Sequence, residues 1–315
     1  MTPLRTAVIG VGYLGAFHAQ KYASLPGVEL VGVADSNSAR AAEVAAACGC
    51  RAFDDHRALL GQVDAVSVVV PTRHHFEIAR EFLANNVHVL VEKPITTTIE
   101  QADALISLAE AQRLVLQVGH LERFNPVLQA AVAKMDRPLF VESVRVAPFC
   151  PRGTDVNVVL DLMIHDIELI QYLVKAPVVS IDAIGAPVFT AEEDIANARI
   201  GFGNGCVANV TASRISLKSE RKMRVFQRDA YLVLDFQNRK LLAANRLQAD
   251  QQQVTVPQLQ VVEQDLGQSD PLLAEISSFV EAIVTGREPL VNGYAGRMAL
   301  ETALKINAAL SRGMA

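Results

Sequence analysis

The sequence predicts an α/β fold, in which a doubly wound parallel sheet is followed by a second α/β domain with a largely antiparallel sheet. Near the N-terminus, short apolar runs alternate with alanine-rich helical segments. Several runs are apolar on both faces, as residues 66–70 show, which is typical of strands buried in a parallel sheet. After Pro126 a series of strands follows, with a hairpin signal at residues 203–205, and hairpins join antiparallel strands.

The first domain, residues 1–122, is expected to consist of β-α units. Its apolar runs predict strands at residues 6–12, 29–35, 65–70, 88–92 and 114–119, with a weaker one near residues 51–54. Helices are expected between them, at residues 14–24, 38–48, 74–85 and 99–111. Such a series indicates a doubly wound nucleotide-binding domain.

The second domain, residues 123–315, combines helices with sequential strands. Helices are expected at residues 127–135, 155–174, 272–285 and 294–312. Extended segments are expected at residues 139–147, 178–186, 196–202, 206–212, 222–227, 231–236 and 253–262. We expect a largely antiparallel sheet with helices on one face, and the two C-terminal helices can pack back on the first domain.

Composition and charge argue against several classes of function. The 315 residues are 50% hydrophobic and carry a net charge of −5, so we expect no basic surface for nucleic acid. No apolar run approaches the roughly 20 residues that span a bilayer. The first residues lead straight into a strand, without a signal segment. We therefore expect a cytoplasmic protein with neither nucleic acid nor a membrane as partner.

The cysteines give no sign of a metal site. Cys48 and Cys50 have the wrong spacing for a zinc knuckle, and Cys150 and Cys206 lie far away in the sequence. Free thiols in a reducing compartment are expected. No bound metal is expected either, because a site built on His165 would need more His and Asp ligands.

A glycine-rich turn lies between the first strand and the first helix. It has the pattern Gly-x-Gly-x-x-Gly at Gly10, Gly12 and Gly15, with Tyr13 and Leu14 at its helical end. The glycines permit a tight turn and close approach of the backbone to a pyrophosphate, while the helix N-terminus faces the phosphates. We therefore expect this turn to bind a dinucleotide.

Asp35 indicates which dinucleotide this is. It ends the second strand, 20 positions after Gly15 (35 − 15). An acid there accepts hydrogen bonds from the ribose hydroxyls and repels a 2′-phosphate. The nearest arginine after it is Arg40. The sequence therefore favours NAD over NADP.

Two further motifs follow strands of the first domain. Their residues are Pro71, Thr72, His75, Glu92 and Lys93. Both motifs lie at the carboxyl ends of parallel strands, where open sheets bind ligands. We expect both to contact the cofactor, with Glu92 orienting the Lys93 ammonium group and Pro94 rigidifying the turn.

Asp161 and His165 lie four residues apart in the apolar run at residues 155–174. In a helix they stack on one face, one turn apart, and Asn157 and Glu168 extend the stripe. Buried Asp and His are costly unless something uses or pairs them. The expected use is proton transfer with a substrate, and a surface helix with a polar face is the alternative.

Oxidation of a secondary alcohol would give these residues defined roles. His165 is the expected base, since an unperturbed imidazole has a pKa near 6.5. Asp161 would hold the histidine or bind an adjacent hydroxyl, and Lys93 would polarise the oxygen. Lys93 is an alternative base if burial lowers its pKa. Arg152 and Arg214 are candidates for binding a diphosphate, with an ordinary structural ion pair as the alternative for each.

Together, these motifs resemble those of the Gfo/Idh/MocA oxidoreductases, in the same order and over essentially the whole chain. The resemblance implies a Rossmann domain followed by an α/β domain with an open sheet, whose exposed face makes a homodimer or homotetramer. It also implies that Lys93, Asp161 and His165 line the site where nicotinamide meets a sugar or cyclitol hydroxyl.

A narrower resemblance is to the UDP-N-acetylglucosamine 3-dehydrogenase branch of this family. It is carried by residues 118–126, 152–155, 161–166 and 194–199. It implies NAD-dependent oxidation of carbon 3 of UDP-N-acetylglucosamine or a related UDP-sugar. The residues expected at the substrate are Arg123, Arg152, Asp161 and Arg214.

Two positions depart from the family pattern. Leu121 stands where many members carry Asn, and residues 157–160 replace a glycine-rich segment. An inositol or free-sugar dehydrogenase of the same family is an alternative function. A non-catalytic regulator that binds a dinucleotide is another, although such members would be expected to lose the lysine or the histidine, which this chain keeps.

Overall fold

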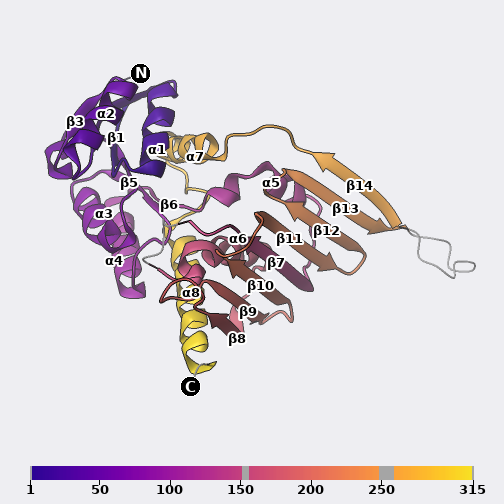
Figure 1. Cartoon of the computed structure of the whole chain (residues 1–315). Coiled ribbons are helices and arrows are strands. Elements are labelled where there is room, and N and C mark those ends of the chain that lie inside the picture. Colours follow the sequence, from indigo (N-terminus) through magenta and orange to yellow (C-terminus); the bar gives the residue numbers. More distant parts are fainter. Residues whose placement is uncertain (1, 151–155, 248–258, 314–315) are drawn as a thin grey trace, which may run out of the picture. The chain divides into compact units, whose positions relative to one another are not determined.

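The structure is a computed structural model that falls into two compact units (Figure 1). It describes residues 2–150, 156–247 and 259–313. The first unit comprises Met1–Leu121 and Asp270–Leu300, and the second comprises Glu122–Ser269 and Glu301–Ala315. None of the described helices is both long and apolar enough to cross a bilayer.

A six-stranded parallel sheet forms the centre of the first unit, in the order β3-β2-β1-β4-β5-β6. The strands are β1 (Leu4–Ile9), β2 (Val28–Ala34), β3 (Arg51–Phe53), β4 (Ala65–Val68), β5 (His88–Glu92) and β6 (Leu116–Gly119). Every residue of β4 is buried, as its apolar sequence predicts for a strand covered on both faces. The strand order is that of dinucleotide-binding sheets, so the predicted doubly wound fold is confirmed.

Helices cover this sheet. They are α1 (Tyr13–Ser24), α2 (Ser38–Cys48), α3 (His75–Ala84), α4 (Ile99–Gln112) and α7 (Pro271–Thr285), with short 3₁₀ turns η1 (His56–Leu59) and η2 (Thr72–His74). Residues of α1, α2 and α7 share one hydrophobic cluster with β1 and β2, while α3 and α4 pack against each other. The first unit thus includes α7, which the sequence places far from the other helices.

Local signals in the sequence fix the ends of α7. Asp270 caps its N-terminus by accepting a hydrogen bond from the Leu273 backbone N–H at 3.0 Å, and Pro271 occupies the first turn. Gly286 ends the helix in the left-handed conformation, with φ of 65°. Between these ends, Ile276 and Phe279 are completely buried. This burial explains why the unit needs a helix from the C-terminal part of the chain.

An eight-stranded sheet forms the centre of the second unit, in the order β14-β13-β12-β11-β7-β10-β9-β8. The strands are β7 (Phe140–Val146), β8 (Val178–Ala186), β9 (Ile195–Phe202), β10 (Val207–Ser213), β11 (Glu220–Gln227), β12 (Ala230–Asp235), β13 (Lys240–Arg246) and β14 (Leu259–Asp265). Only β7 and β10 pair in parallel; the other neighbours are antiparallel. The predicted, largely antiparallel second sheet is therefore confirmed.

One face of this sheet is covered by helical segments. The helical segments of the second unit are η3 (Leu121–Phe124), α5 (Pro126–Val132), η4 (Val159–Met163) and α6 (Ile164–Val174), and α8 (Gly293–Gly313) contributes its later residues. Both η4 and α6 pack on β10, and α6 also packs on β7. Buried residues alternate along β7 and β9, as one covered face requires.

Three details differ from the sequence-based expectations. Strand β13 was not expected, because its sequence, KLLAANR, contains good helix formers. Strand β14 continues to Asp265, beyond the expected end at residue 262, and the earlier part of that expected strand lies outside the described residues. The expected helix at residues 155–174 begins with a π-helical turn, η4.

Candidate active site

The glycine-rich turn joins β1 to α1 and has the geometry that a dinucleotide needs. Gly10 has a φ of 84°, and a Cβ atom there would lie 2.5 Å from the Val69 carbonyl oxygen. A Cβ on Gly15 would lie 1.9 Å from the Gly10 oxygen, so helix and turn are in close contact. A Cβ on Gly12 would meet nothing within 4 Å. The backbone is therefore open at Gly12, where a pyrophosphate can approach the start of α1.

A cavity of about 500 Å³ lies beside this turn within the first unit. Its lining includes Gly10, Gly12, Asp35, Val70, Pro71 and His74. These residues come from the ends of β1 and β2 and from the segment after β4. The cavity therefore brings together parts of three predicted cofactor motifs, and its lining residues fit a dinucleotide.

Asp35 binds the backbone on both sides of the cavity rim. One carboxylate oxygen accepts a hydrogen bond from the Val11 N–H at 2.8 Å, and the other accepts one from the Asn37 N–H at 2.9 Å. Arg40 also reaches this turn, donating from Nε to the Val11 carbonyl oxygen at 2.8 Å. Sequence spacing did not reveal this arginine contact, because α2 turns the side chain back toward β1.

His75 lies in the interior between two strand-end segments. Its Nδ1 is 2.8 Å from the Pro94 carbonyl oxygen, and its Nε2 is 2.8 Å from the Val70 carbonyl oxygen. Burial lowers the pKa of His75. Since both ring nitrogens already face backbone oxygens, the structure gives this residue a role in joining the two segments. Pro71 and Thr72, at the start of η2, lie on the surface side of the same segment.

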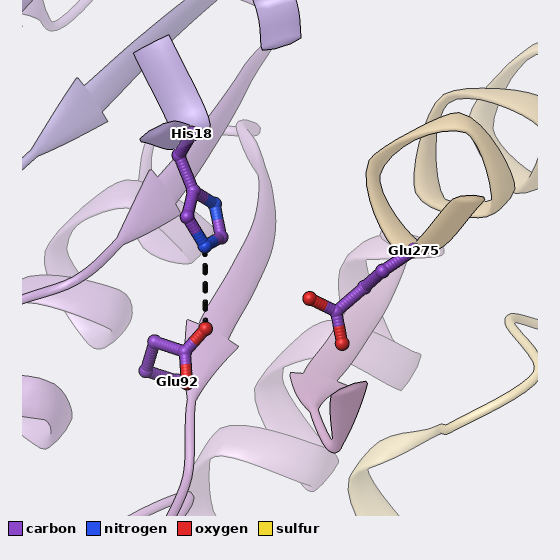
Figure 2. A group of neighbouring side chains, drawn as sticks. All are labelled: His18, Glu92 and Glu275. Carbon is purple, nitrogen blue, oxygen red and sulfur yellow. Dashed lines mark ion pairs between the residues drawn. The ribbon is translucent and has the colours of Figure 1, made fainter. Parts of the chain in front are cut away.

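Glu92 contacts a histidine in the interior of the first unit and the backbone of Lys93, and its expected contact with the Lys93 ammonium group stays a prediction. Its Oε1 lies 3.3 Å from Nε2 of His18 (Figure 2). Its Oε2 accepts a hydrogen bond from the Lys93 backbone N–H at 3.3 Å. A Cβ on Gly119 would lie 2.6 Å from this carboxyl group, so the glycine leaves room for it. Glu92 therefore holds the backbone of Lys93 by a hydrogen bond from the inside of the first unit.

The segment that carries Asp161 and His165 starts in the π-helix η4. Asn157 precedes it, accepting a hydrogen bond from the Leu160 N–H at 3.3 Å and donating one to Asn307 at 2.9 Å. Asp161 and His165 are both partly exposed. A π-helical turn widens the spacing along a helix face and is frequent at functional sites. The segment between Asn157 and His165 thus departs from a regular helix of 3.6 residues per turn, and the shared face of Asp161 and His165 stays a prediction.

Arg123 is part of a buried ion pair. Its Nη1 donates to the Glu168 carboxylate at 2.6 Å, and its guanidinium group lies 3.4 Å from the centre of the Tyr172 ring. Burial raises the pKa of Glu168 to about 7, although Arg123 opposes this rise. Because the guanidinium group is enclosed, the structure favours a structural role over the expected contact with substrate.

Arg214 is held in the same way by a loop of the second unit. It donates to Asp194 at 2.8 Å, to the Val156 carbonyl oxygen at 2.7 Å and to the Thr190 hydroxyl at 3.0 Å. These contacts occupy each nitrogen of the guanidinium group. The structural ion pair, which the sequence left open as the alternative to a diphosphate site, is what the structure shows. Arg152 lies outside the described residues.

Arg145 is a site-supporting residue that sequence reasoning missed. It donates from Nε to Asp166 at 2.6 Å and from Nη1 to Glu122 at 3.1 Å, and it is buried. The two carboxylates more than offset the effect of burial, so the pKa of Arg145 is raised above its usual value. This network fixes the residue next to His165. An arginine at an inward position of an alternating strand was the available signal.

Comparison with known proteins identifies the family. The profile described as "Oxidoreductase family, NAD-binding Rossmann fold" matches residues 4–120, and that of the GFO/IDH/MocA C-terminal domain matches residues 148–233. This chain belongs to the Gfo/Idh/MocA family. The predicted family membership, the oxidoreductase class and the Rossmann fold are confirmed.

Two relatives differ in how much of the chain they cover. The UDP-N-acetylglucosamine 3-dehydrogenase of Acidithiobacillus ferrooxidans is 44% identical over 98% of both chains, and its structure matches with a TM-score of 0.92. The scyllo-inositol 2-dehydrogenase of Bacillus subtilis is 29% identical over 68% of both chains. A levoglucosan dehydrogenase in complex with NADH and levoglucosan has a TM-score of 0.86 at 19% identity, which shows a shared fold alone.

Proposed function

We propose that this oxidoreductase oxidises the 3-hydroxyl of UDP-N-acetylglucosamine or a closely related UDP-sugar with NAD as cofactor. The observation that carries this proposal is the 44% identity to a UDP-N-acetylglucosamine 3-dehydrogenase, which extends over nearly the full length of both chains. Both the cofactor domain and the second domain are therefore matched. A match limited to the first domain would have supported the cofactor and left the substrate open.

The cofactor is proposed to bind at the glycine-rich turn and to supply the hydride acceptor. Gly12 leaves the backbone accessible, and the N-terminus of α1 faces the phosphates. Asp35 supports NAD over NADP, because its carboxylate would repel a 2′-phosphate. Arg40 is already bonded to the turn and to Glu43, which weakens it as a phosphate ligand.

Proton transfer is proposed to involve Lys93, Asp161 and His165. His165 accepts the proton of the sugar hydroxyl, and Asp161 orients it or binds a neighbouring hydroxyl. Lys93 stabilises the negative charge that develops on the oxygen. If Lys93 is instead the base, His165 becomes the hydrogen-bond donor, and the variants described below distinguish the two roles.

Binding experiments test the substrate class most directly. UDP-N-acetylglucosamine should bind the NAD complex far more tightly than free N-acetylglucosamine, because charged diphosphate contacts contribute strongly to affinity. Isothermal titration with both ligands, and with inositol and glucose as controls, measures this difference. If inositol or glucose binds and turns over as well as the UDP-sugar, the function is that of a polyol or free-sugar dehydrogenase. If no sugar reduces NAD, a non-catalytic regulator becomes the better assignment.

We further propose that the second unit forms a homodimer or homotetramer through the open face of its sheet. An aromatic ladder lies on that face, where Phe226 contacts Phe140 and Tyr231 on neighbouring strands, with ring centres 5.6 and 4.8 Å apart. Apolar patches of this kind mark interaction surfaces. Cys48, Cys50 and Cys206 are free thiols, which agrees with a proposed location in the reducing cytoplasm.

A further inference from the structure

Three titratable side chains converge in the interior of the first unit, and we call them the inner trio (Figure 2). They are His18 from α1, Glu92 from the end of β5 and Glu275 from α7. His18 and Glu275 are fully buried, and the Glu92 side chain is 12% exposed. One nitrogen or oxygen atom of each lies within 4.8 Å of the others.

His18 has a polar neighbour at each ring nitrogen. Its Nδ1 lies 3.2 Å from the Ser67 hydroxyl, which is 2.9 Å from the Tyr22 hydroxyl. Its Nε2 faces Glu92 at 3.3 Å. Glu92 is thereby connected to a chain of polar groups on one side and to the Lys93 backbone on the other.

Glu275 is in a different situation. Neither of its carboxyl oxygens has a hydrogen-bond partner among the described residues, and the side chain is completely buried. An ionised carboxylate without a partner is among the most costly groups to bury, and Glu92 adds a second negative charge nearby. Burial, and then the charge of Glu92, raise the pKa of Glu275 well above its ordinary value.

We propose that Glu275 is kept as a neutral carboxylic acid whose O–H donates a hydrogen bond to the Glu92 carboxylate, so that the inner trio holds the end of β5 and positions Lys93. The two carboxyl groups are not hydrogen-bonded to each other in the structure, since neither oxygen of Glu275 has a partner among the described residues. We infer that rotation about the last side-chain bond of Glu275, a torsion with a broad minimum, brings its O–H to Glu92, while Glu92 keeps its contacts with His18 and the Lys93 backbone. Glu275 is thus a positioning residue that acts through Glu92. The link to Lys93 rests on the proposed function, whereas the protonation state of Glu275 does not.

The proposal has a defined consequence for stability as a function of pH. The groups that face Glu275 are His18 and Tyr22 from α1 and Glu92 from β5; at the start of α7, Asp270 is already paired with Lys21 at 2.6 Å. A carboxyl group with a raised pKa in the folded state binds a proton that the unfolded chain has released. Stability is therefore complete below the ordinary pKa of about 4.5 and falls as the pH rises toward the raised value.

Glu275→Gln tests this pH dependence of stability directly. The amide keeps the shape of the carboxylic acid and its hydrogen-bond donor, but it cannot ionise. Above pH 4.5, the unfolding equilibrium constant of the unchanged protein should rise by about tenfold per pH unit relative to that of the variant. The slope is about tenfold because unfolding of the unchanged protein releases one proton from Glu275. Glu281→Gln is the matched control, since Glu281 is exposed on the same helix. It should follow the unchanged protein at every pH.

Infrared spectroscopy provides an independent readout. At neutral pH the difference spectrum between the unchanged protein and Glu275→Gln should show the C=O stretching band of a protonated carboxylic acid. The Glu168 carboxyl group, whose pKa is about 7, contributes equally to both spectra and cancels. The proposal is overturned if the band is absent, or if Glu275→Gln fails to fold, because a neutral side chain is then not sufficient. It is also overturned if metal analysis finds one divalent cation per chain that Glu275→Gln releases, because an ionised Glu275 would then bind that cation with Glu92 and His18.

The positioning of Lys93 is tested by turnover. Glu275→Leu removes the hydrogen-bond donor and should lower kcat by about tenfold relative to Glu275→Gln, the rate equivalent of one hydrogen bond. NAD affinity should remain the same in both variants. Equal kcat values would overturn the link to Lys93. If no UDP-sugar is oxidised by the unchanged protein, the proposed function fails, while the infrared and unfolding results still decide the state of Glu275.

Discussion

Asp35 has a structural role and a proposed role in cofactor choice. Its carboxylate accepts hydrogen bonds from the backbone N–H groups of Val11 and Asn37, and the residue also lines the cavity. A carboxylate facing a 2′-phosphate costs roughly 1–3 kcal/mol, so NAD should bind at least about tenfold more tightly than NADP. Asp35→Asn should narrow this gap, and calorimetric titration of both cofactors measures it. Asp54→Asn is a suitable control, since Asp54 is an exposed residue of the same cavity. Equal affinities in the unchanged protein would contradict the assignment.

Replacement of the proposed proton-transfer groups should affect chemistry and leave cofactor binding intact. His165→Ala and Lys93→Met should each lower kcat by about 10²–10⁴, the usual contribution of a positioned acid or base. Lys175→Met, an exposed residue at the end of α6, serves as control. Steady-state kinetics together with NAD titration measure both quantities. The group whose loss removes the acidic limb of the pH–rate profile is the base, because a base must be deprotonated to act. Near-normal activity in both variants would refute the assignment.

Single residues also show where sequence reasoning reaches its limit. The glycine-rich turn could be predicted because its function depends on the backbone and on spacing within six residues. The role of Arg214 could not, since Asp194 is 20 residues away and only the fold brings it to 2.8 Å. Arg123 and Glu168, 45 residues apart, give the same lesson. Residue type indicates what a side chain is able to bind, whereas its partner depends on the tertiary structure.

The loop between β8 and β9 depends on one carboxylate. Asp194 accepts hydrogen bonds from the backbone N–H groups of Val188, Phe189 and Thr190 and pairs with Arg214. Burial alone would raise the pKa of Asp194, but these contacts hold it below its ordinary value. Its contribution to stability is therefore present above pH 3.8 and is lost as the pH falls through the lowered pKa.

Asp194→Asn should consequently lower the free energy of unfolding by about 3–5 kcal/mol at pH 7, the usual effect of breaking a buried ion pair. The difference from the unchanged protein should shrink in acid, where both proteins carry a neutral side chain. Urea unfolding at several pH values measures it, with the exposed neighbour Glu192→Gln as control. A loss that did not vary with pH would show that shape, and not charge, is responsible.

Elements differed in how well they could be predicted. Strands β4 and β5 were clear because continuous apolar runs leave no other location than a covered sheet. Strand β13 was missed because its leucines and alanines favour helices, and pairing with β12 and β14 overrides that preference. The π-helical turn η4 was not predicted, because its sequence, VLDLM, fits an ordinary helix equally well.

Assembly is expected at the scale of the whole molecule. If the aromatic ladder of the second unit is an interface, Phe226→Asp should shift the protein from dimer or tetramer toward monomer, because a charge at the centre of an apolar contact is not compensated. Light scattering after size-exclusion chromatography reports the mass. Val284→Asp, on the exposed side of α7, should leave the mass unchanged. A monomeric unchanged protein would refute the proposed interface.

The first unit is built from two separate segments of the chain, which has a consequence for folding during synthesis. Its sheet and its first helices are complete by residue 121, yet α7 is synthesised only after most of the chain. Until Ile276 and Phe279 leave the ribosome, the apolar surface that they cover around Tyr22 and Leu90 has no permanent cover. Domains generally fold during synthesis from the N-terminus onward, but this one must wait. A nascent chain that stalls before residue 270 would expose that surface, and chaperones that bind apolar segments would recognise it.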